Sequence, residues 1–155
     1  MKIYFASDHA GFELKNTLVA YLRDEKGMEV VDCGAFEYDE KDNFTVWIPK
    51  AVKEVEQDME NNNFESRAII LGGSGEGEAM EANRFKGIRA TVFYGGDTKI
   101  LELSKEHNDA NVLSLGARFL TEGEAKEAVD IWLAATFTGL ERYERRNDAL
   151  DDDAV

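Results

Sequence analysis

Short apolar segments alternate along the chain with longer segments in which apolar residues recur every three or four positions. We expect the short segments to be buried strands, and they lie at 3–8, 29–34, 68–71, 87–94 and 112–116. Because segments of helical spacing separate the strands, the strands should run parallel, with helices on both sides. The pattern predicts an α/β fold, a three-layer, Rossmann-like sandwich built around a five-stranded parallel sheet.

Local signals mark the ends of several helices. The apolar spacing predicts helices over 12–25, 46–59, 79–84, 97–107, 121–135 and 142–150. Gly27 follows the first helix as a C-cap, and Asp97 is the expected N-cap of a later one. Thr121 and Glu124 have the spacing of a capping box. Pro49 is tolerated only in the first turn of its helix.

The length of 155 residues corresponds to one domain. The chain contains no internal repeat, linker or low-complexity segment. We therefore expect residues 1–150 to form a single domain that includes the C-terminal helix. Residues 151–155 are expected to be a disordered tail.

The net charge of −14 narrows the range of possible partners. Nucleic acids and anionic membranes require a basic surface, so neither is expected to bind. No apolar run approaches the roughly 20 residues of a membrane-spanning helix, and the one cysteine, Cys33, fits a reducing cytoplasm. His9 and His107 are the only histidines, and no Cys–His cluster has metal spacing. A small phosphorylated ligand remains compatible, because it responds to local charge.

The predicted topology places a binding site at one edge of the sheet. In parallel sheets, ligands bind beyond the carboxyl ends of the strands. Four segments follow strands in this way: Asp8–His9, residues 72–78, Gly95–Gly96 and residues 116–118. We expect these segments to lie near one another.

The turn after the third strand is rich in glycine and also contains two glutamates. Its sequence is Gly72-Gly73-Ser74-Gly75-Glu76-Gly77-Glu78. It lacks the Lys-Ser/Thr of a Walker A loop and the spacing of a dinucleotide-binding G-x-G-x-x-G motif. Two interpretations remain open: a tight turn with two solvated glutamates, or a cradle of N–H groups for an oxyanion beside a proton-transferring glutamate. Sequence position separates Glu76 from Glu78 only weakly, although Glu78 should lie at the helix N-terminus.

Three other polar groups each allow a structural or a functional interpretation. The Asp8–His9 pair closes the first strand. His107 ends a helix, where a histidine either interacts with the helix dipole or takes part in catalysis. Arg142 and Arg146 lie four residues apart on one helical face, which is either solvated or suited to binding phosphate.

Taken together, these segments form a longer pattern that runs in order along nearly the whole chain. It comprises Ser7-Asp8-His9-Ala10-Gly11-Phe12-Glu13-Leu14-Lys15, Asp32-Cys33-Gly34, the turn 72–78, Ala82-Asn83-Arg84, Gly87-Ile88-Arg89-Ala90, His107-Asn108-x-x-Asn111, Gly116-x-Arg118 and Arg142-x-x-x-Arg146. This pattern resembles the type B ribose-5-phosphate isomerase family, which also includes galactose-6-phosphate and allose-6-phosphate isomerases.

The resemblance implies an enzyme of the pentose phosphate pathway that interconverts ribose 5-phosphate and ribulose 5-phosphate. The reaction passes through an enediolate and needs neither metal nor cofactor. In many members the base is a cysteine that opens the glycine turn, but Gly72 holds that position here. A second branch uses a glutamate at the far end of the turn. Glu78 matches it and is the expected base.

The resemblance also implies roles for other residues. Ser74 would lie near the sugar, Asp8 would bind sugar oxygens, and His107 would help to open the furanose ring, with Asn108 beside it. The enediolate oxygen would be held by the N–H groups around Gly73, Gly75 and Gly77. The phosphate would be held by His9, Arg118, Arg142 and Arg146. Family members are dimers or tetramers whose sites are built from two subunits, so we expect a cytoplasmic homodimer or homotetramer.

The chain departs from the family in one loop. Members commonly have Asp-Tyr-Pro after the second strand, where we align Asn43-Phe44-Thr45. The tyrosine hydroxyl is lost, which bears on a sugar contact and on the preferred sugar; Arg142-Tyr143 also replaces a frequent Arg-His pair. Two alternatives to a pentose phosphate isomerase stay open: an isomerase of a six-carbon sugar phosphate, and a non-catalytic module that binds sugar phosphates or nucleotides.

Overall fold

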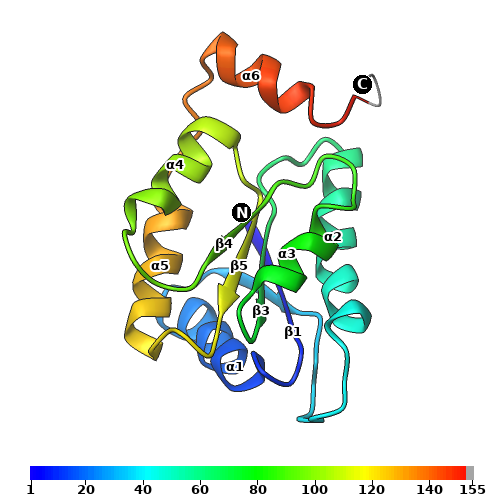
Figure 1. Cartoon of the computed structure of the whole chain (residues 1–155), viewed down its shortest axis with the longest axis vertical. Coiled ribbons are helices and arrows are strands. Elements are labelled where there is room, and N and C mark those ends of the chain that lie inside the picture. Colours follow the sequence, from blue (N-terminus) through cyan, green and yellow to red (C-terminus); the bar gives the residue numbers. More distant parts are fainter. Residues whose placement is uncertain (153–155) are drawn as a thin grey trace.

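A parallel sheet forms the centre of the molecule in the computed structural model, which describes residues 1–152 (Figure 1). The five strands lie in the order β2-β1-β3-β5-β4. Their bounds are Lys2–Ser7 (β1), Glu29–Asp32 (β2), Arg67–Gly72 (β3), Ala90–Phe93 (β4) and Val112–Gly116 (β5). The predicted fold class is confirmed, and β5 has the predicted bounds.

A helix follows every strand, which makes all the strand pairings parallel. The helices are Phe12–Ala20 (α1), which continues as the π-helical turn Tyr21–Glu25 (η1), Phe44–Glu60 (α2), Glu76–Ala82 (α3), Lys99–Asn108 (α4), Glu122–Ala134 (α5) and Glu141–Asp148 (α6). All six expected helical segments are therefore present, with ends that differ by a few residues.

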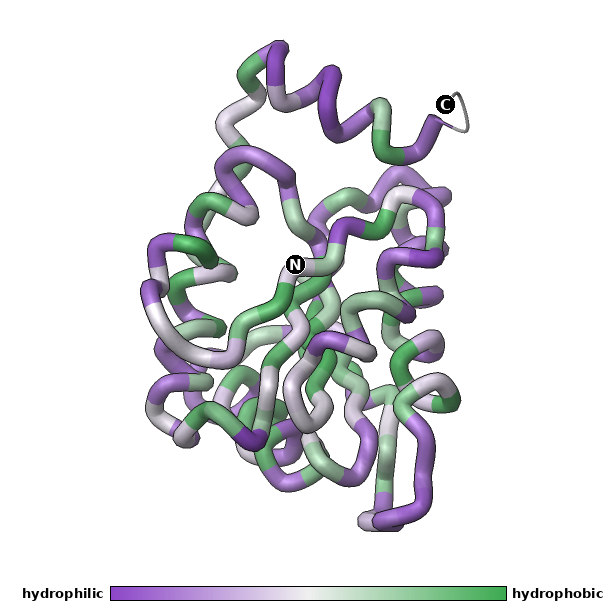
Figure 2. The backbone as a smooth tube through the Cα atoms, viewed as in Figure 1, coloured by the Kyte–Doolittle hydropathy of each residue, from purple (hydrophilic) through white to green (hydrophobic). Residues whose placement is uncertain are grey.

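Alternate strand residues contact different helical layers, because successive side chains of a strand point to opposite faces. Ile3 and Phe5 pack in a core with residues of α1, α4 and α5. Tyr4 and Ala6 pack on the other face with residues of α2 and α3. Figure 2 shows hydrophobic residues gathered along the strands and a mostly hydrophilic α6.

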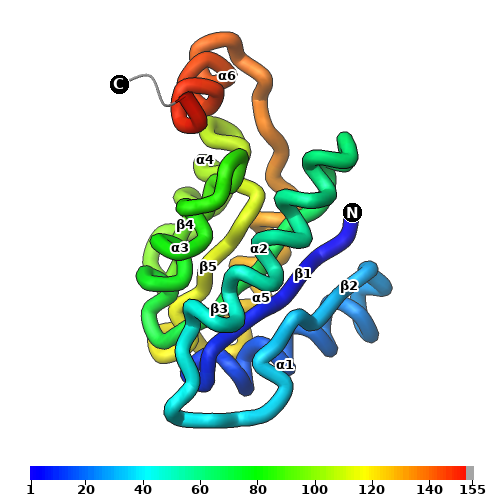
Figure 3. The backbone as a smooth tube through the Cα atoms, turned by 90° about the vertical axis from the view of Figure 1, so that its right-hand side faces the viewer, coloured from blue at the N-terminus to red at the C-terminus, as the bar shows by residue number. Residues whose placement is uncertain are grey.

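The helix α6 lies at the opposite end of the sheet from the carboxyl ends of the strands. Figures 1 and 3 both place it beyond the amino ends of the strands, next to α4. The contact includes the ring of Tyr143, which stacks on that of His107 with centroids 4.4 Å apart. Because α6 lies at this end, its side chains are far from the carboxyl ends of the strands of the same chain.

The second long helix begins one residue after Asn43, earlier than the apolar spacing indicates. Pro49 therefore lies in the second turn, and the expectation that it occupies the first turn is wrong. Proline lacks the N–H group that would bond to the carbonyl four residues back. The helix extends upstream of it because Phe44 and Trp47 pack against the core formed by α2 and the sheet.

Two of the predicted caps are formed by the predicted side chains. Thr121 Oγ1 accepts the N–H of Glu124, and the Glu124 carboxylate accepts the N–H of Thr121, which confirms the capping box. Asp97 Oδ1 accepts the N–H of Lys99 at 2.9 Å, although the helix begins at Lys99 and the cap position is formally Thr98.

The expected tail falls partly outside the described residues. Asp151 is held in place, since its carboxylate accepts the N–H of Gly87 at 2.8 Å. Residues 153–155 lie outside the part of the chain that the structure describes.

Candidate active site

The carboxyl ends of β1, β3 and β5 meet at one edge of the sheet, where residues that follow β3 and β5 line a cleft. β1, β3 and β5 are neighbours, so the residues that follow them lie side by side. The N–H groups of Ala117 and Arg118 donate to the carbonyls of Gly72 and Gly73 at 2.9 and 3.1 Å, which ties the two turns together. The cleft has a volume of about 410 Å³ and is lined by Phe44, Gly73, Ser74, Gly77, Glu78, Arg118 and Phe119.

The fourth expected segment does not reach this cleft. Gly95 and Gly96 follow β4, the edge strand beyond β5, and neither is among the residues that line the cleft. The segment after β4 does lie beside the segment after β5, as expected, since a Cβ built on Gly116 would lie 2.7 Å from the Tyr94 Cβ and the Tyr94 ring is 5.8 Å from that of Phe119. It stays outside the cleft because the strand order puts β5 between β4 and β3.

The glycines of the turn are required by close packing. Gly75 has a φ of +82°, and a Cβ there would lie 3.0 Å from Ser114 Oγ on β5. A Cβ on Gly77 would lie 3.1 Å from the Phe44 ring. Gly73 and Gly77 therefore line the cleft beside Arg118 and Phe44, whereas Gly75 packs behind them against β5.

The Glu78 carboxylate lies directly over Gly72. A Cβ built on Gly72 would overlap both carboxylate oxygens of Glu78. The glutamate therefore fills the space that any side chain at residue 72 would enter. Only one of residues 72 and 78 can therefore place side-chain atoms in this space at the end of β3.

Burial distinguishes the two glutamates of the turn. Glu78 is 4% exposed, whereas Glu76 is exposed to solvent. Burial raises the pKa of Glu78 above its ordinary value, and the nearby charge of Asp8 raises it further, against a hydrogen bond from the backbone that lowers it. A carboxylate with a raised pKa is a better proton acceptor once ionised, so Glu78 has the properties of a general base.

Asp8 and Ser74 both lie near this carboxylate. Asp8 is 8% exposed, and its Oδ1 accepts the N–H groups of Ala10 and Gly11 at 2.9 and 3.2 Å. Ser74 lines the cleft, and its Oγ accepts the N–H of Glu76 at 3.3 Å. The structure thus brings Asp8, Ser74 and Glu78 to one edge of the sheet, as the sequence predicts.

His9 is held by an aspartate that the sequence did not single out. Asp42 Oδ1 accepts both the backbone N–H of His9 at 3.0 Å and the ring Nδ1 at 2.8 Å. The other oxygen of Asp42 accepts the Trp47 indole N–H at 3.1 Å. The contact requires the hydrogen on Nδ1, so Asp42 fixes both the orientation of the ring and its proton.

The sequence contained a signal for Asp42. Our alignment placed the family triplet at Asn43-Phe44-Thr45 and so assigned asparagine to the aspartate position. The structure shows an aspartate one residue upstream that reaches the site. Asp8, His9 and Asp42 also bring three potential metal ligands within 4.8 Å of one another, but the donor atoms of His9 and Asp42 that face each other are already paired.

The remaining predicted site residues form a second group at the opposite end of the sheet. His107 and Asn108 end α4, which runs antiparallel to the strands, and Arg142 and Arg146 lie on α6. The Tyr143 ring contacts three of these residues. It stacks on the ring of His107, and its hydroxyl accepts a hydrogen bond from Arg142 Nη2 at 2.8 Å. The Arg146 guanidinium lies 6.0 Å from the centroid of the same ring. Within one chain, the structure does not bring these four residues to Glu78.

No helix among residues 1–152 is both long enough and apolar enough to span a membrane. This agrees with the absence of a long apolar run in the sequence.

Comparisons with known proteins relate nearly the whole chain to one group of enzymes. A family described as Ribose/Galactose Isomerase matches residues 3–150. Ribose-5-phosphate isomerase B of Mycolicibacterium paratuberculosis is 37% identical over 150 residues, covering 97% of this chain and 89% of that protein. Ribose-5-phosphate isomerase B of Escherichia coli is 36% identical over 149 residues, covering 96% and 93%.

Solved structures give the same result for the fold. Ribose-5-phosphate isomerase B of Mycoplasma genitalium with bound ribulose-5-phosphate has a TM-score of 0.86 at 33% identity, covering 96% of this chain and 93% of that one. The enzyme of Thermotoga maritima has a TM-score of 0.84 at 37% identity, covering 97% of each chain.

Proposed function

We propose how this chain, which belongs to the ribose/galactose isomerase family, carries out an aldose–ketose isomerisation. The substrate pair is ribose 5-phosphate and ribulose 5-phosphate. The buried Glu78 carboxylate in the cleft is the observation that carries the proposal. The related proteins bear the name of this reaction, and one of them was solved with ribulose-5-phosphate bound.

Glu78 is the proposed base. It would take the proton from C2 of the open-chain aldose, leaving an enediolate, and deliver it to C1, while the hydroxyl proton of O2 passes to O1 so that C2 becomes the carbonyl of the ketose. Burial supports this role, because a carboxylate removed from water retains less of the hydration that weakens it as a base. Glu76 is exposed and has no comparable environment.

The negative charge that develops on the substrate oxygen would be stabilised by N–H groups of the glycine turn. Residues 76–78 form the first turn of α3, where N–H groups have no acceptor within the helix. The N–H of Glu76 already donates to Ser74 Oγ, and that of Glu78 acts on its own carboxylate. The N–H of Gly77 is therefore the proposed donor from this turn. Gly73 and Gly77 allow the substrate to approach the main chain, since neither has a side chain. Fixed donors of this kind typically lower a barrier by about 3 kcal/mol each.

Other groups of the cleft would bind the substrate. Asp8 and Ser74 would contact the sugar oxygens, while His9 and Arg118 would contact the phosphate. Arg118 lies at the cleft beside Gly73, and Asp42 holds the His9 ring in a fixed orientation. Although the protein as a whole is strongly acidic, the positive charge of Arg118 favours the binding of an anionic substrate in the cleft.

The site would be completed by a second subunit. His107 and Asn108 would open the sugar ring, and Arg142 and Arg146 would bind the phosphate, but all four lie at the far end of their own sheet. In a symmetric homodimer or homotetramer, this end of one subunit can cover the cleft of another. Covering the cleft would also exclude water from Glu78.

Glu78→Gln tests the proposed base. The variant should lose about a thousandfold in kcat, the range typical of a removed general base, while ribose 5-phosphate still binds. Glu76→Gln is the matched control from the same turn and should keep wild-type rates. Turnover of Glu78→Gln at the wild-type rate would remove Glu78 from this role; loss in the Glu76 variant alone would assign the role to Glu76.

The Phe44 ring favours one competing substrate. It lines the cleft and touches Gly77, where the family commonly has a tyrosine in our alignment. A six-carbon sugar phosphate, such as allose or galactose 6-phosphate, is therefore the second candidate. Comparing kcat/KM for pentose and hexose phosphates separates the two, and negligible pentose activity would contradict our assignment.

A further inference from the structure

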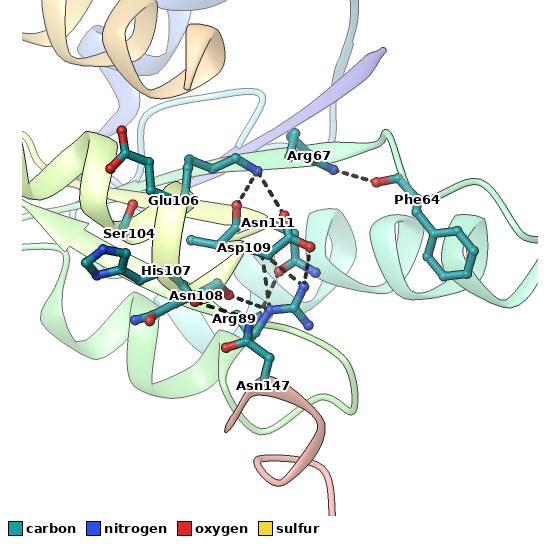
Figure 4. Close-up of polar contacts among 12 residues, drawn as sticks. Phe64, Arg67, Arg89, Ser104, Glu106, His107, Asn108, Asp109, Asn111 and Asn147 are labelled. Carbon is teal, nitrogen blue, oxygen red and sulfur yellow. Dashed lines mark hydrogen bonds and ion pairs between the residues drawn. The ribbon is translucent and has the colours of Figure 1, made fainter. Parts of the chain in front are cut away.

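A cluster of basic side chains lies at the amino ends of the strands, away from the cleft. Figure 4 shows Arg67 and Arg89 near Asp109, at the end of α4. Arg89 Nη2 donates to Asp109 Oδ2 at 3.0 Å, and Lys105 Nζ reaches Asp109 Oδ1 at 3.4 Å. Three cationic side chains thus surround one aspartate, in a protein that carries a net charge of −14.

Arg67 is the member of this cluster without an ion pair. Within residues 1–152 its Nη1 donates only to the carbonyls of Phe64 and Ser66, at 2.7 and 2.8 Å. The Lys105 side chain is 4% exposed, and its Nζ donates to the Ala110 carbonyl at 2.9 Å. Burial, together with the charge of Arg67, lowers the pKa of Lys105 to about 8. Among the described residues, Asp109 is the one carboxylate within ion-pair distance of Arg89 and Lys105, and Arg67 has none.

The side chains of Arg67 and Lys105 open into a cavity of about 260 Å³. Its wall includes Arg67, Lys105, Asp109, Trp132, Leu133 and Phe137. Trp132 is fully buried, and its indole N–H has no hydrogen-bond acceptor within the described residues. Lys105 Nζ lies 5.5 Å from the centroid of the Trp132 ring. A buried donor without an acceptor is uncommon in folded proteins and points to a missing partner.

The mouth of the cavity carries a second acid, Glu65. Its side chain is 82% exposed, so water screens its charge from the interior. Asp109 is shared between Arg89 and Lys105. Neither acid supplies what the inner wall lacks, which is an anion in contact with both Arg67 and Lys105.

We propose that this cavity binds a phosphate group, as the free ion or as a small monoester. Arg67 and Lys105 would contact the phosphate oxygens, while Leu133 and Phe137 would contact the apolar part of an ester. Two cations suit a dianion better than a single carboxylate, and a cavity of this size can contain a phosphate with a short carbon chain. The site is separate from the isomerase cleft and does not depend on the function proposed for it.

Tryptophan fluorescence can test the site directly, because the chain has two tryptophans, Trp47 and Trp132. In a Trp47→Phe background, Trp132 is the one remaining reporter. Titration with inorganic phosphate should give a saturable fluorescence change in the millimolar range or below. Glycerol 3-phosphate, a monoester, should give a similar or tighter curve, and acetate should bind more weakly.

Two variants in the same background separate this site from the cleft. Arg67→Met keeps the aliphatic stem and should weaken the phosphate curve at least about tenfold, equivalent to one lost charge-assisted contact. Arg118→Met removes a cation of the cleft and should leave the Trp132 signal unchanged. The proposal is overturned if phosphate gives no saturable change, if acetate binds as tightly, or if Arg118→Met rather than Arg67→Met abolishes the signal.

Discussion

At the scale of single residues, the absence of a side chain at Gly72 is as important as the presence of one at Glu78. A Cβ at residue 72 would occupy the position of the Glu78 carboxylate. Gly72→Ala should therefore displace the base and lower kcat by about a hundredfold or more, because small misplacements of a catalytic group have effects of this size. Steady-state kinetics measures this.

The matched control for that substitution is Gly123→Ala. Gly123 lies in α5, and a Cβ there would meet no atom within 4 Å. Its rates should stay at the wild-type value. Full activity of Gly72→Ala would show that Glu78 does not act from the position described.

Asp42 contacts His9, and we expect it to affect substrate binding through that ring. Asp42→Asn removes the charge that orients the ring and should raise KM about tenfold with a smaller effect on kcat. Trp47→Phe removes one donor to Asp42 and should have a weaker effect in the same direction. Asp39→Asn, in the same loop, is the control, since Asp39 accepts an N–H from Lys41 and is exposed. An unchanged KM in Asp42→Asn would mean that His9 needs no support.

The sequence could name residue types for the site but not their environments. Glu76 and Glu78 lie in one turn with the same chemistry, and only the packing of α3 against the sheet buries the second of them. The contact between Asp42 and His9 could not be read from spacing, because 33 positions separate them in the chain. The family triplet was the one signal for this aspartate, and it was aligned one residue downstream.

At the scale of elements, an ion pair formed by a buried lysine joins α1 to the end of β2. Lys15 is fully buried and pairs with Asp32, whose other oxygen accepts the N–H of Gly34 at 2.9 Å. Asp32→Asn leaves a buried cation without its counter-charge and should lower the free energy of unfolding by about 3 kcal/mol. Urea denaturation measures this.

An exposed pair provides the comparison. Glu102→Gln breaks the pair between Lys99 and Glu102, both well exposed, and should leave the stability close to that of the wild type, because water screens the two charges. Lys15→Met combined with Asp32→Asn should recover part of the loss, because no buried charge is then left unpaired. Equal stability of the two single variants would show that the buried pair contributes no more than a surface one.

Periodicity was sufficient to find every strand and helix, because each has one or two buried faces. The residues at which the helices and strands begin and end were less predictable from the periodicity. The start of α2 depends on Phe44 and Trp47 packing against the sheet, so the helix continues upstream of Pro49. The predicted fourth strand, 87–94, is shorter because Gly87 has a φ of +74°, which extended backbone does not adopt.

At the scale of the whole molecule, the proposed site is divided between the two ends of the sheet. If two subunits share each site, Glu78→Gln and Arg146→Ala carry defects in different halves. After subunit exchange, half of the dimers are mixed, and each of these has one intact site. The mixture should recover about a quarter of wild-type activity.

Activity of the exchanged mixture is measured against each variant alone at the same total concentration. Glu78→Gln mixed with Asp8→Asn is the control, because both changes lie in the same half and no intact site can form. The absence of recovery in the first mixture, together with proof of exchange, would place all site residues within one chain. The family resemblance implied a shared site, but the sequence pattern alone did not show which residues belong to which half, since that depends on the end of the sheet that each helix reaches.

The shared volume at residues 72 and 78 also limits how such a site can evolve. A side chain at residue 72 and the Glu78 carboxylate cannot occupy this volume together, so Gly72→Cys would require the glutamate to turn away. The substituted chain would then depend on the new thiol as its base, whereas loss of Glu78 alone would leave neither base. The order of the two changes therefore matters, and a library randomised at both positions should yield active combinations of one base with one small residue.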